Sequence, residues 1–87
     1  MNSIITDDFM KCCASLPAEV RELARRAYRI WRENPAHPGL RFKPIRGHDA
    51  LYSVRVGLGW RALGRMDGDT MVWFWIGSHA DYEGLIA

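Results

Sequence analysis

Two arginines, a histidine and a tyrosine in the C-terminal half of this chain are the residue types of an RNA-cleaving site that needs no metal ion. Arg55 and Arg61 can together bind one phosphate and stabilise the charge that builds up when an RNA 2′-hydroxyl attacks it. His79 can donate or accept a proton there, and Tyr82 can protonate a leaving 5′-oxygen or stack on a base. Each also has an ordinary structural explanation, because exposed sheet arginines, loop histidines and packed tyrosines are common.

Alternating apolar and polar residues predict the strands that must position the arginines. Strands are expected at about residues 51–56, 60–65 and 71–76, joined by a loop at 57–59 and a two-residue turn at Asp67 and Gly68. This order predicts an antiparallel meander. The segment 40–43 alternates apolar with basic residues before Pro44, which favours an additional edge strand.

The phase of the alternation predicts where the arginines point. Arg55 should share a face of the sheet with Ser53, because the residues on either side of it are apolar. Arg61 alternates with Trp60 and Ala62 in the same way. In the last strand both alternating sets are apolar, namely Val72, Phe74 and Ile76 on one side and Met71, Trp73 and Trp75 on the other. Both faces of that strand therefore need cover, which the chain's tail or a partner must supply on one of them.

The N-terminal third of the chain is predicted to be helical. Thr6 followed by Asp7 and Asp8 resembles an N-cap with acidic residues in the first turn, which predicts a short helix to about Ser15 after a brief strand at Ile4 and Ile5. A second helix begins near Pro17 and runs to about residue 34. Its apolar stripe consists of Leu16, Val20, Leu23, Ala24, Ala27, Ile30 and Trp31.

Length and charge limit the classes of function. The 87 residues suffice for one domain, spanning 1–87. Residues 21–65 carry eleven basic and three acidic side chains, whereas the remainder carries one lysine and seven acids. This asymmetry predicts a basic face for a phosphate backbone or an acidic protein. No apolar run approaches the roughly 18 residues that span a bilayer, so we expect a cytoplasmic protein without membrane contact.

The cysteines and histidines do not predict a covalent or metal-dependent framework. Cys12 and Cys13 are adjacent and have no third cysteine with which to pair. His37, His48 and His79 lack the short paired spacings of a zinc site. We therefore expect neither a metal nor another cofactor.

The order of several segments resembles the RelE/ParE superfamily of bacterial type II toxin–antitoxin toxins. The matching segments are Leu16-Pro17, the helix end at 31–35, residues 37–45, the strand pair at 52–64 and the end at 76–82. The resemblance implies an α+β fold in which two N-terminal helices pack on a twisted antiparallel sheet of three to four strands. It also implies a cognate antitoxin as partner.

The RelE branch of this superfamily cleaves messenger RNA on the ribosome with the RNA's own 2′-hydroxyl as nucleophile. By position, Arg55 and Arg61 look like that branch's basic strand residues, and His79 and Tyr82 like its C-terminal residues. Lys43, together with Arg41, Arg46 and Trp60, is then expected to contact RNA. The site also departs from the branch, since Ser53 stands where a strand lysine is expected and no glutamate is placed as general base.

These departures leave two other functions open. The ParE branch inhibits DNA gyrase and needs no such site, and a degenerate toxin would only bind its antitoxin. The sequence therefore predicts a ribosome-dependent endoribonuclease that inhibits translation, with a gyrase inhibitor or a degenerate toxin as the alternatives.

Overall fold

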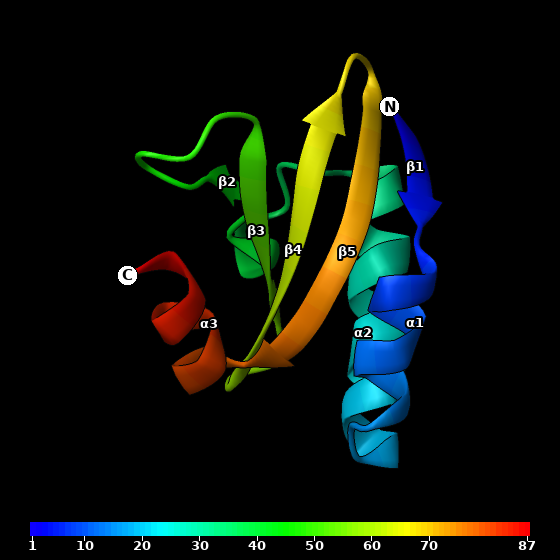
Figure 1. Cartoon of the computed structure of the whole chain (residues 1–87). Coiled ribbons are helices and arrows are strands. Elements are labelled where there is room, and N and C mark those ends of the chain that lie inside the picture. The colour runs from blue at the N-terminus through cyan, green and yellow to red at the C-terminus, as the bar shows by residue number, and fades with distance from the viewer.

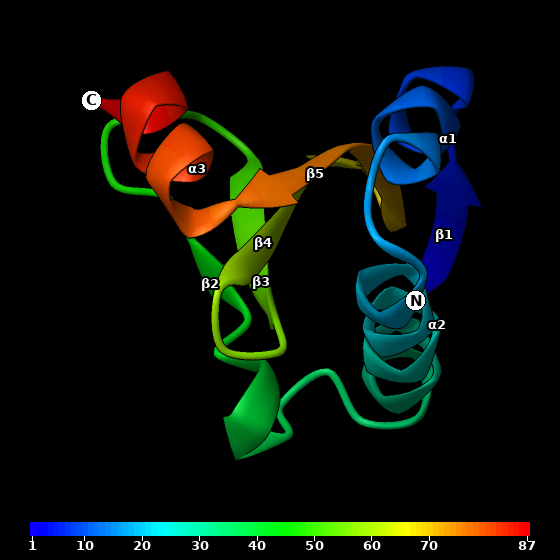
Figure 2. The same ribbon diagram turned by 90° about the horizontal axis from the view of Figure 1, so that it is seen from below.

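A twisted five-stranded sheet separates two layers of helices in the computed structural model, which describes residues 1–87 (Figure 1). Helices α1 and α2 cover one face and α3 lies on the other, as the view from below also shows (Figure 2). The elements in chain order are β1 (Asn2–Ile5), α1 (Asp7–Ala14), α2 (Ala18–Glu33), the 3-10 turn η1 (Pro38–Leu40), β2 (Lys43–Pro44), β3 (Leu51–Val56), β4 (Trp60–Asp67), β5 (Thr70–Ser78) and α3 (His79–Ile86).

The α+β class is confirmed, but the sheet is larger than the predicted three to four strands and is mixed. Its strand order is β1-β5-β4-β3-β2. The meander β3-β4-β5 is antiparallel as predicted, and the short N-terminal strand adds to it in parallel, with Asn2 opposite Thr70 and Ile5 opposite Trp73. This pairing makes β5 an interior strand. None of the helices has the length and apolar character needed to span a bilayer.

Helix α1 begins at the predicted N-cap. The Thr6 hydroxyl accepts a hydrogen bond from the Phe9 amide at 3.1 Å, and Asp7 and Asp8 lie in the first turn. Both features stabilise a helix N-terminus, because the free amides are satisfied and the acids complement the helix dipole. The same hydroxyl donates to the Trp73 carbonyl at 2.8 Å. Thr6 therefore connects the start of α1 to the sheet.

Replacing Thr6 by alanine is expected to lower the free energy of unfolding by about 1 kcal/mol, the usual loss for an N-cap side chain. Urea denaturation followed by circular dichroism measures it. Thr70→Ala is the matched control, since that hydroxyl contacts only the adjacent Asp69 side chain, at 3.5 Å. Equal midpoints for the two variants would show that the Thr6 cap does not stabilise the fold.

The apolar stripe of α2 forms the main core, as predicted. Trp31 is 1% exposed and meets Trp73 of β5 edge to face, with ring centroids 5.2 Å apart. Phe42 packs on the same indole at 5.8 Å. Gly64 of β4 permits this packing, because a Cβ there would come within 2.7 Å of the Trp73 ring. The helix-side core is therefore built around two tryptophans.

A β-bulge in β5 interrupts the alternation of faces that was predicted for the last strand. Leu63 faces Trp75 and Gly64 faces Trp73, so Phe74 is an extra residue in β5. The bulge shifts the phase of the strand by one residue. As a result Met71, Trp73 and Ile76 belong to the helix-side core, whereas Phe74 and Trp75 pack with the second core on the opposite face.

The C-terminal segment of the chain covers the second face of the sheet. Of the two predicted possibilities, the tail and a partner, the structure therefore shows the tail. Helix α3 was not expected from the sequence. Its Tyr82 is 7% exposed and forms a small core with Ile45 and Leu63. The helix begins at an N-cap, because the Ser78 hydroxyl accepts from the Asp81 amide at 3.1 Å. The pattern Ser78-x-x-Asp81 was the available sequence signal.

Two local predictions are wrong in detail. The expected strand at 40–43 is reduced to Lys43–Pro44, because the chain turns through η1 and Arg41 adopts a left-handed φ of 47°. Leu40, 3% exposed, holds this turn against the core. In the β4–β5 hairpin the loop residues are Gly68 and Asp69, since Asp67 still pairs with Thr70. Gly68 supplies the positive φ of 60° at the first loop position.

Candidate functional site

Arg55 and Arg61 lie directly opposite each other on β3 and β4 and therefore share one face of the sheet. Arg61 in turn faces Gly77 of β5, immediately before α3 begins. Neither arginine forms an ion pair with an acidic residue. Like charges directly opposite on neighbouring strands destabilise a sheet. The arrangement is therefore costly for the free protein, and an anion bound by both guanidinium groups would offset that cost.

The hydrogen bonds of the two arginines leave donors free. The Arg55 Nε donates to the Gly57 carbonyl at 3.1 Å, which holds its side chain beside the β3–β4 loop. The Arg61 Nη1 is buried and has no hydrogen-bond partner. A buried donor without a partner costs about 1–3 kcal/mol. The protein itself therefore does not satisfy this donor of Arg61.

His79 lies beside Arg61 because α3 begins next to the β3–β4 loop. The His79 amide donates to the Gly59 carbonyl at 2.8 Å, which anchors the first residue of the helix. The Arg61 Nε then donates to the His79 Nδ1 at 3.4 Å. The imidazole is thus within reach of anything that Arg61 binds, as the sequence hypothesis required.

Tyr82 is a buried residue whose ring contacts both His79 and Arg61. Its ring stacks on His79 with centroids 5.9 Å apart, and the Arg61 Cζ lies 5.8 Å from its centroid. The remaining surface of the ring packs in the second core. Because the residue is buried, its ring offers little open face to a nucleobase. Packing and its hydroxyl are the contributions that the geometry supports.

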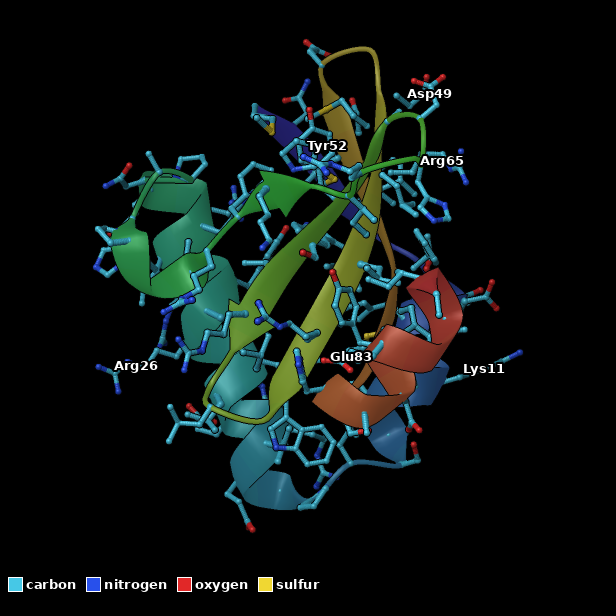
Figure 3. The ribbon with its side chains drawn as sticks, turned by 90° about the vertical axis from the view of Figure 1, so that its left-hand side faces the viewer. Lys11, Arg26, Asp49, Tyr52, Arg65 and Glu83 are labelled. Carbon is cyan, nitrogen blue, oxygen red and sulfur yellow. The ribbon has the colours of Figure 1, made fainter.

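Glu83 is a member of the site that sequence reasoning missed. Its Oε1 lies 2.6 Å from the His79 Nε2, at the i,i+4 spacing of a helix. The two residues become neighbours only because 79–86 is helical, which had not been expected. Both ring nitrogens of His79 are therefore engaged, one by Arg61 and one by Glu83. Figure 3 shows this face of the sheet, with Glu83 on α3 and Arg65 toward the far end of β4.

Of the four residues expected to contact RNA, the three basic ones are exposed and the tryptophan packs against the core. Lys43 pairs with Ser53, so it is exposed on the same face as Arg55, at the edge of the sheet. Arg41 and Arg46 are exposed in the segments flanking β2. The Arg41 amide donates to the Pro38 carbonyl at 3.3 Å, which closes the η1 turn. Trp60 alternates with Arg61 and packs against the helix-side core. The structure therefore places Trp60 on the face of β4 opposite to that of Arg61.

Ser53 occupies the position at which the resemblance led us to expect a second strand lysine. It is fully buried, and its hydroxyl has no hydrogen-bond partner. The position lies opposite Leu63, a member of the second core that α3 completes. A lysine there would place its charge under α3. The serine is therefore compatible with this packing, and it removes one cation from the site.

A separate apolar cavity lies between α1, α2 and the sheet. Its volume is about 540 Å³, and 14 of its 16 lining residues are hydrophobic. Arg21 and Arg25 of α2 are the two charged residues of the lining. Met10, which also lines it, is 57% exposed. The cavity is lined by neither Arg55 nor Arg61 and is separate from them.

The comparisons with known proteins identify the family and the fold. A family model described as the ParE-like toxin domain matches residues 18–84. No curated protein sequence is significantly similar to the chain.

Solved toxin structures share the fold. A chain of the RelB–RelE antitoxin–toxin complex from Methanococcus jannaschii superimposes with a TM-score of 0.76 at 18% identity, covering 97% of this chain and 99% of that chain. The toxin–antitoxin complex RelBE2 from Mycobacterium tuberculosis matches with a TM-score of 0.70 at 21% identity, covering 90% and 96%. The YoeB/ParE toxin from Agrobacterium tumefaciens gives 0.70 at 16% identity, covering 91% and 99%.

Proposed function

Since this chain belongs to the family of ParE-like toxin domains, we propose that it is the toxin of a type II toxin–antitoxin system and that it cleaves messenger RNA on the ribosome. The proposal rests above all on the arginine pair. Arg55 and Arg61 face each other without an acidic partner, and Arg61 keeps a buried donor unsatisfied. A phosphodiester bound by both guanidinium groups would offset the repulsion between them.

The reaction that fits this site is attack of the RNA 2′-hydroxyl on the adjacent phosphorus. A bond forms between the 2′-oxygen and phosphorus, the bond from phosphorus to the 5′-oxygen breaks, one proton leaves the 2′-hydroxyl and another reaches the 5′-oxygen. Arg55 and Arg61 would stabilise the charge on the phosphoryl oxygens. His79 and the Tyr82 hydroxyl are the proton-transfer groups within reach. Lys43, Arg41 and Arg46 would contact the RNA backbone beside the site.

The proposed nuclease is tested by expressing the chain under a controlled promoter. We expect cleavage of messenger RNA on translating ribosomes within minutes, with plasmid supercoiling unchanged. The opposite result, namely altered supercoiling and DNA damage with intact messenger RNA, would support the gyrase inhibitor. A purified quadruple variant with Arg55, Arg61, His79 and Tyr82 replaced serves as the inactive reference. Activity in that reference would exclude these residues as the nuclease site.

The proposed antitoxin would occupy the apolar cavity between α1 and α2. The cavity is open and apolar, its charged lining residues are both arginines, and residues 21–65 carry most of the basic side chains. An amphipathic segment with acidic residues beside an apolar stripe is complementary to such a surface. Because the segment would bury its apolar stripe only on this surface, we expect it to fold as it binds.

Ala24→Trp is expected to weaken antitoxin binding at least about tenfold, because the indole fills the space that the partner requires, a loss of about 1.4 kcal/mol. Ala24 lines the cavity, whereas Ala18 of the same helix is exposed outside it, so Ala18→Trp is the matched control. The measurement is calorimetric titration with the purified product of the adjacent antitoxin-type gene. Equal affinities for both variants would place the antitoxin elsewhere.

A further inference from the structure

The contact between Glu83 and His79 bears on which nitrogen of His79 can act. The Glu83 carboxylate approaches Nε2 at 2.6 Å, and the Arg61 Nε approaches Nδ1 at 3.4 Å. A carboxylate accepts hydrogen bonds and a guanidinium only donates them. In the neutral imidazole, a proton on Nε2 and a lone pair on Nδ1 therefore match both neighbours. Nδ1 is left with its lone pair, directed toward the arginine that would hold the phosphate.

We propose that Glu83 is a positioning residue that makes His79 the general base of the RNA cleavage, by fixing the proton on Nε2 and leaving Nδ1 as the proton acceptor. The inference rests on the proposed nuclease function. No glutamate of the sequence is placed as the general base, and Glu83 instead assists the histidine that takes the proton. Glu83 itself touches neither the phosphate nor the 2′-hydroxyl.

Each proton that moves in this step has a donor and an acceptor. Nδ1 takes the proton of the 2′-hydroxyl as the bond between the 2′-oxygen and phosphorus forms. The bond to the 5′-oxygen breaks, and that oxygen takes a proton from the Tyr82 hydroxyl or from water. His79 is then an imidazolium between Glu83 and Arg61. The carboxylate stabilises this cation, which partly offsets its repulsion by the guanidinium.

The contact between Arg61 and Nδ1 is the weaker of the two. At 3.4 Å it is longer than the usual range for such a hydrogen bond, whereas the Glu83 contact is short. When a phosphate takes the guanidinium donors, the Arg61 contact can yield and Nδ1 is freed. The Glu83 contact lies on the opposite side of the ring and is unaffected. Substrate binding therefore uncovers the base without changing its tautomer.

Glu83→Ala is expected to lower the single-turnover cleavage rate about 10- to 100-fold, less than the full range for losing a general base, because the base itself remains. The 65% exposure of the Glu83 side chain also limits the effect, since water screens the pair. Substrate affinity should stay within twofold, because Glu83 does not contact RNA. Glu83→Gln should recover part of the rate, since its amide oxygen can still accept the Nε2 proton.

Two further measurements separate positioning from a general structural effect. In a His79→Ala background, Glu83→Ala should cause no additional loss, because Glu83 acts only through His79. Asp81→Asn is the matched control, since it removes an exposed carboxylate from the same helix without touching His79. Nitrogen NMR of the ring should show one tautomer with the proton on Nε2 in the parent chain, and a mixture of tautomers in Glu83→Ala.

The outcomes distinguish this inference from the proposed function. If the parent chain and Glu83→Ala cleave RNA at equal rates while His79→Ala is inactive, the nuclease stands and the role of Glu83 is overturned. An additional tenfold loss from Glu83→Ala in the His79→Ala background would also overturn it. If the folded parent chain cleaves no RNA on ribosomes, the proposed function fails and the general-base role fails with it. The ring spectra then still decide whether Glu83 holds the imidazole.

Discussion

Replacing Arg61 by alanine is expected to lower single-turnover cleavage of messenger RNA on programmed ribosomes by about 10²- to 10³-fold, the typical loss for one charge-stabilising donor. Arg61 lies opposite Arg55 on the neighbouring strand, and its buried Nη1 has no hydrogen-bond partner. The lost interaction is made mainly with the charge that develops on the phosphoryl oxygens. The rate of the chemical step should therefore fall more than the affinity for RNA.

The same strand offers a matched control. Arg65→Ala removes the same charge from an exposed position four residues along β4 from Arg61 (Figure 3). It should leave the cleavage step within about twofold of the parent. Arg61→Lys should recover only part of the rate, because lysine keeps the charge but not the planar fork of donors. Circular dichroism checks that the fold is retained, since Arg61 also packs over the Tyr82 ring.

Loss of the His79 imidazole should lower the cleavage rate more than loss of the Arg61 guanidinium. His79→Ala is expected to reduce the cleavage rate about 10²- to 10⁴-fold, the range for a general acid or base. The imidazole lies beside Arg61 and contacts Glu83, so its loss removes the group proposed as the general base. His48→Ala, at an exposed position in the β2–β3 loop, is the control and should retain the parent rate. Tyr82→Phe should fall in the same range if its hydroxyl protonates the 5′-oxygen.

Together these substitutions distinguish RNA cleavage from gyrase inhibition as the cause of toxicity. If Arg55→Ala, Arg61→Ala, His79→Ala and Tyr82→Phe all remain as toxic as the parent chain, RNA cleavage at this site is not the cause of toxicity. Gyrase inhibition then becomes the better explanation, because it does not require these side chains. A folded but non-toxic parent chain that still binds its antitoxin would instead identify a degenerate toxin.

Local patterns were sufficient to predict the part of the site that lies on β3 and β4. The alternation around Arg55 and Arg61 and the short loop between the strands set the face and the register, because a hairpin with a short loop allows few pairings. The N-cap at Thr6 and the apolar stripe that places Trp31 in the core were likewise predictable. Each of these features depends on residues close together in the sequence.

Features that depend on distant residues were decided only by the tertiary structure. The parallel pairing of β1 with β5 joins residues about seventy positions apart, and no local pattern in either strand specifies it. The bulge at Phe74 forms because both faces of β5 must bury aromatic rings, which the alternation of a regular strand could not satisfy. The predicted set of Val72, Phe74 and Ile76 was therefore divided between the two faces.

Helix α3 shows why the candidate site was found only in part. An isolated eight-residue helix that contains Gly84 is unstable in water, so its sequence alone gave a weak helical signal. In the folded protein the burial of Tyr82 against Ile45 and Leu63 stabilises it. Only then do His79 and Glu83 lie one helical turn apart and face Arg61. The sequence determined which chemical groups are present and the register of the arginines, whereas tertiary packing decided that the carboxylate joins them.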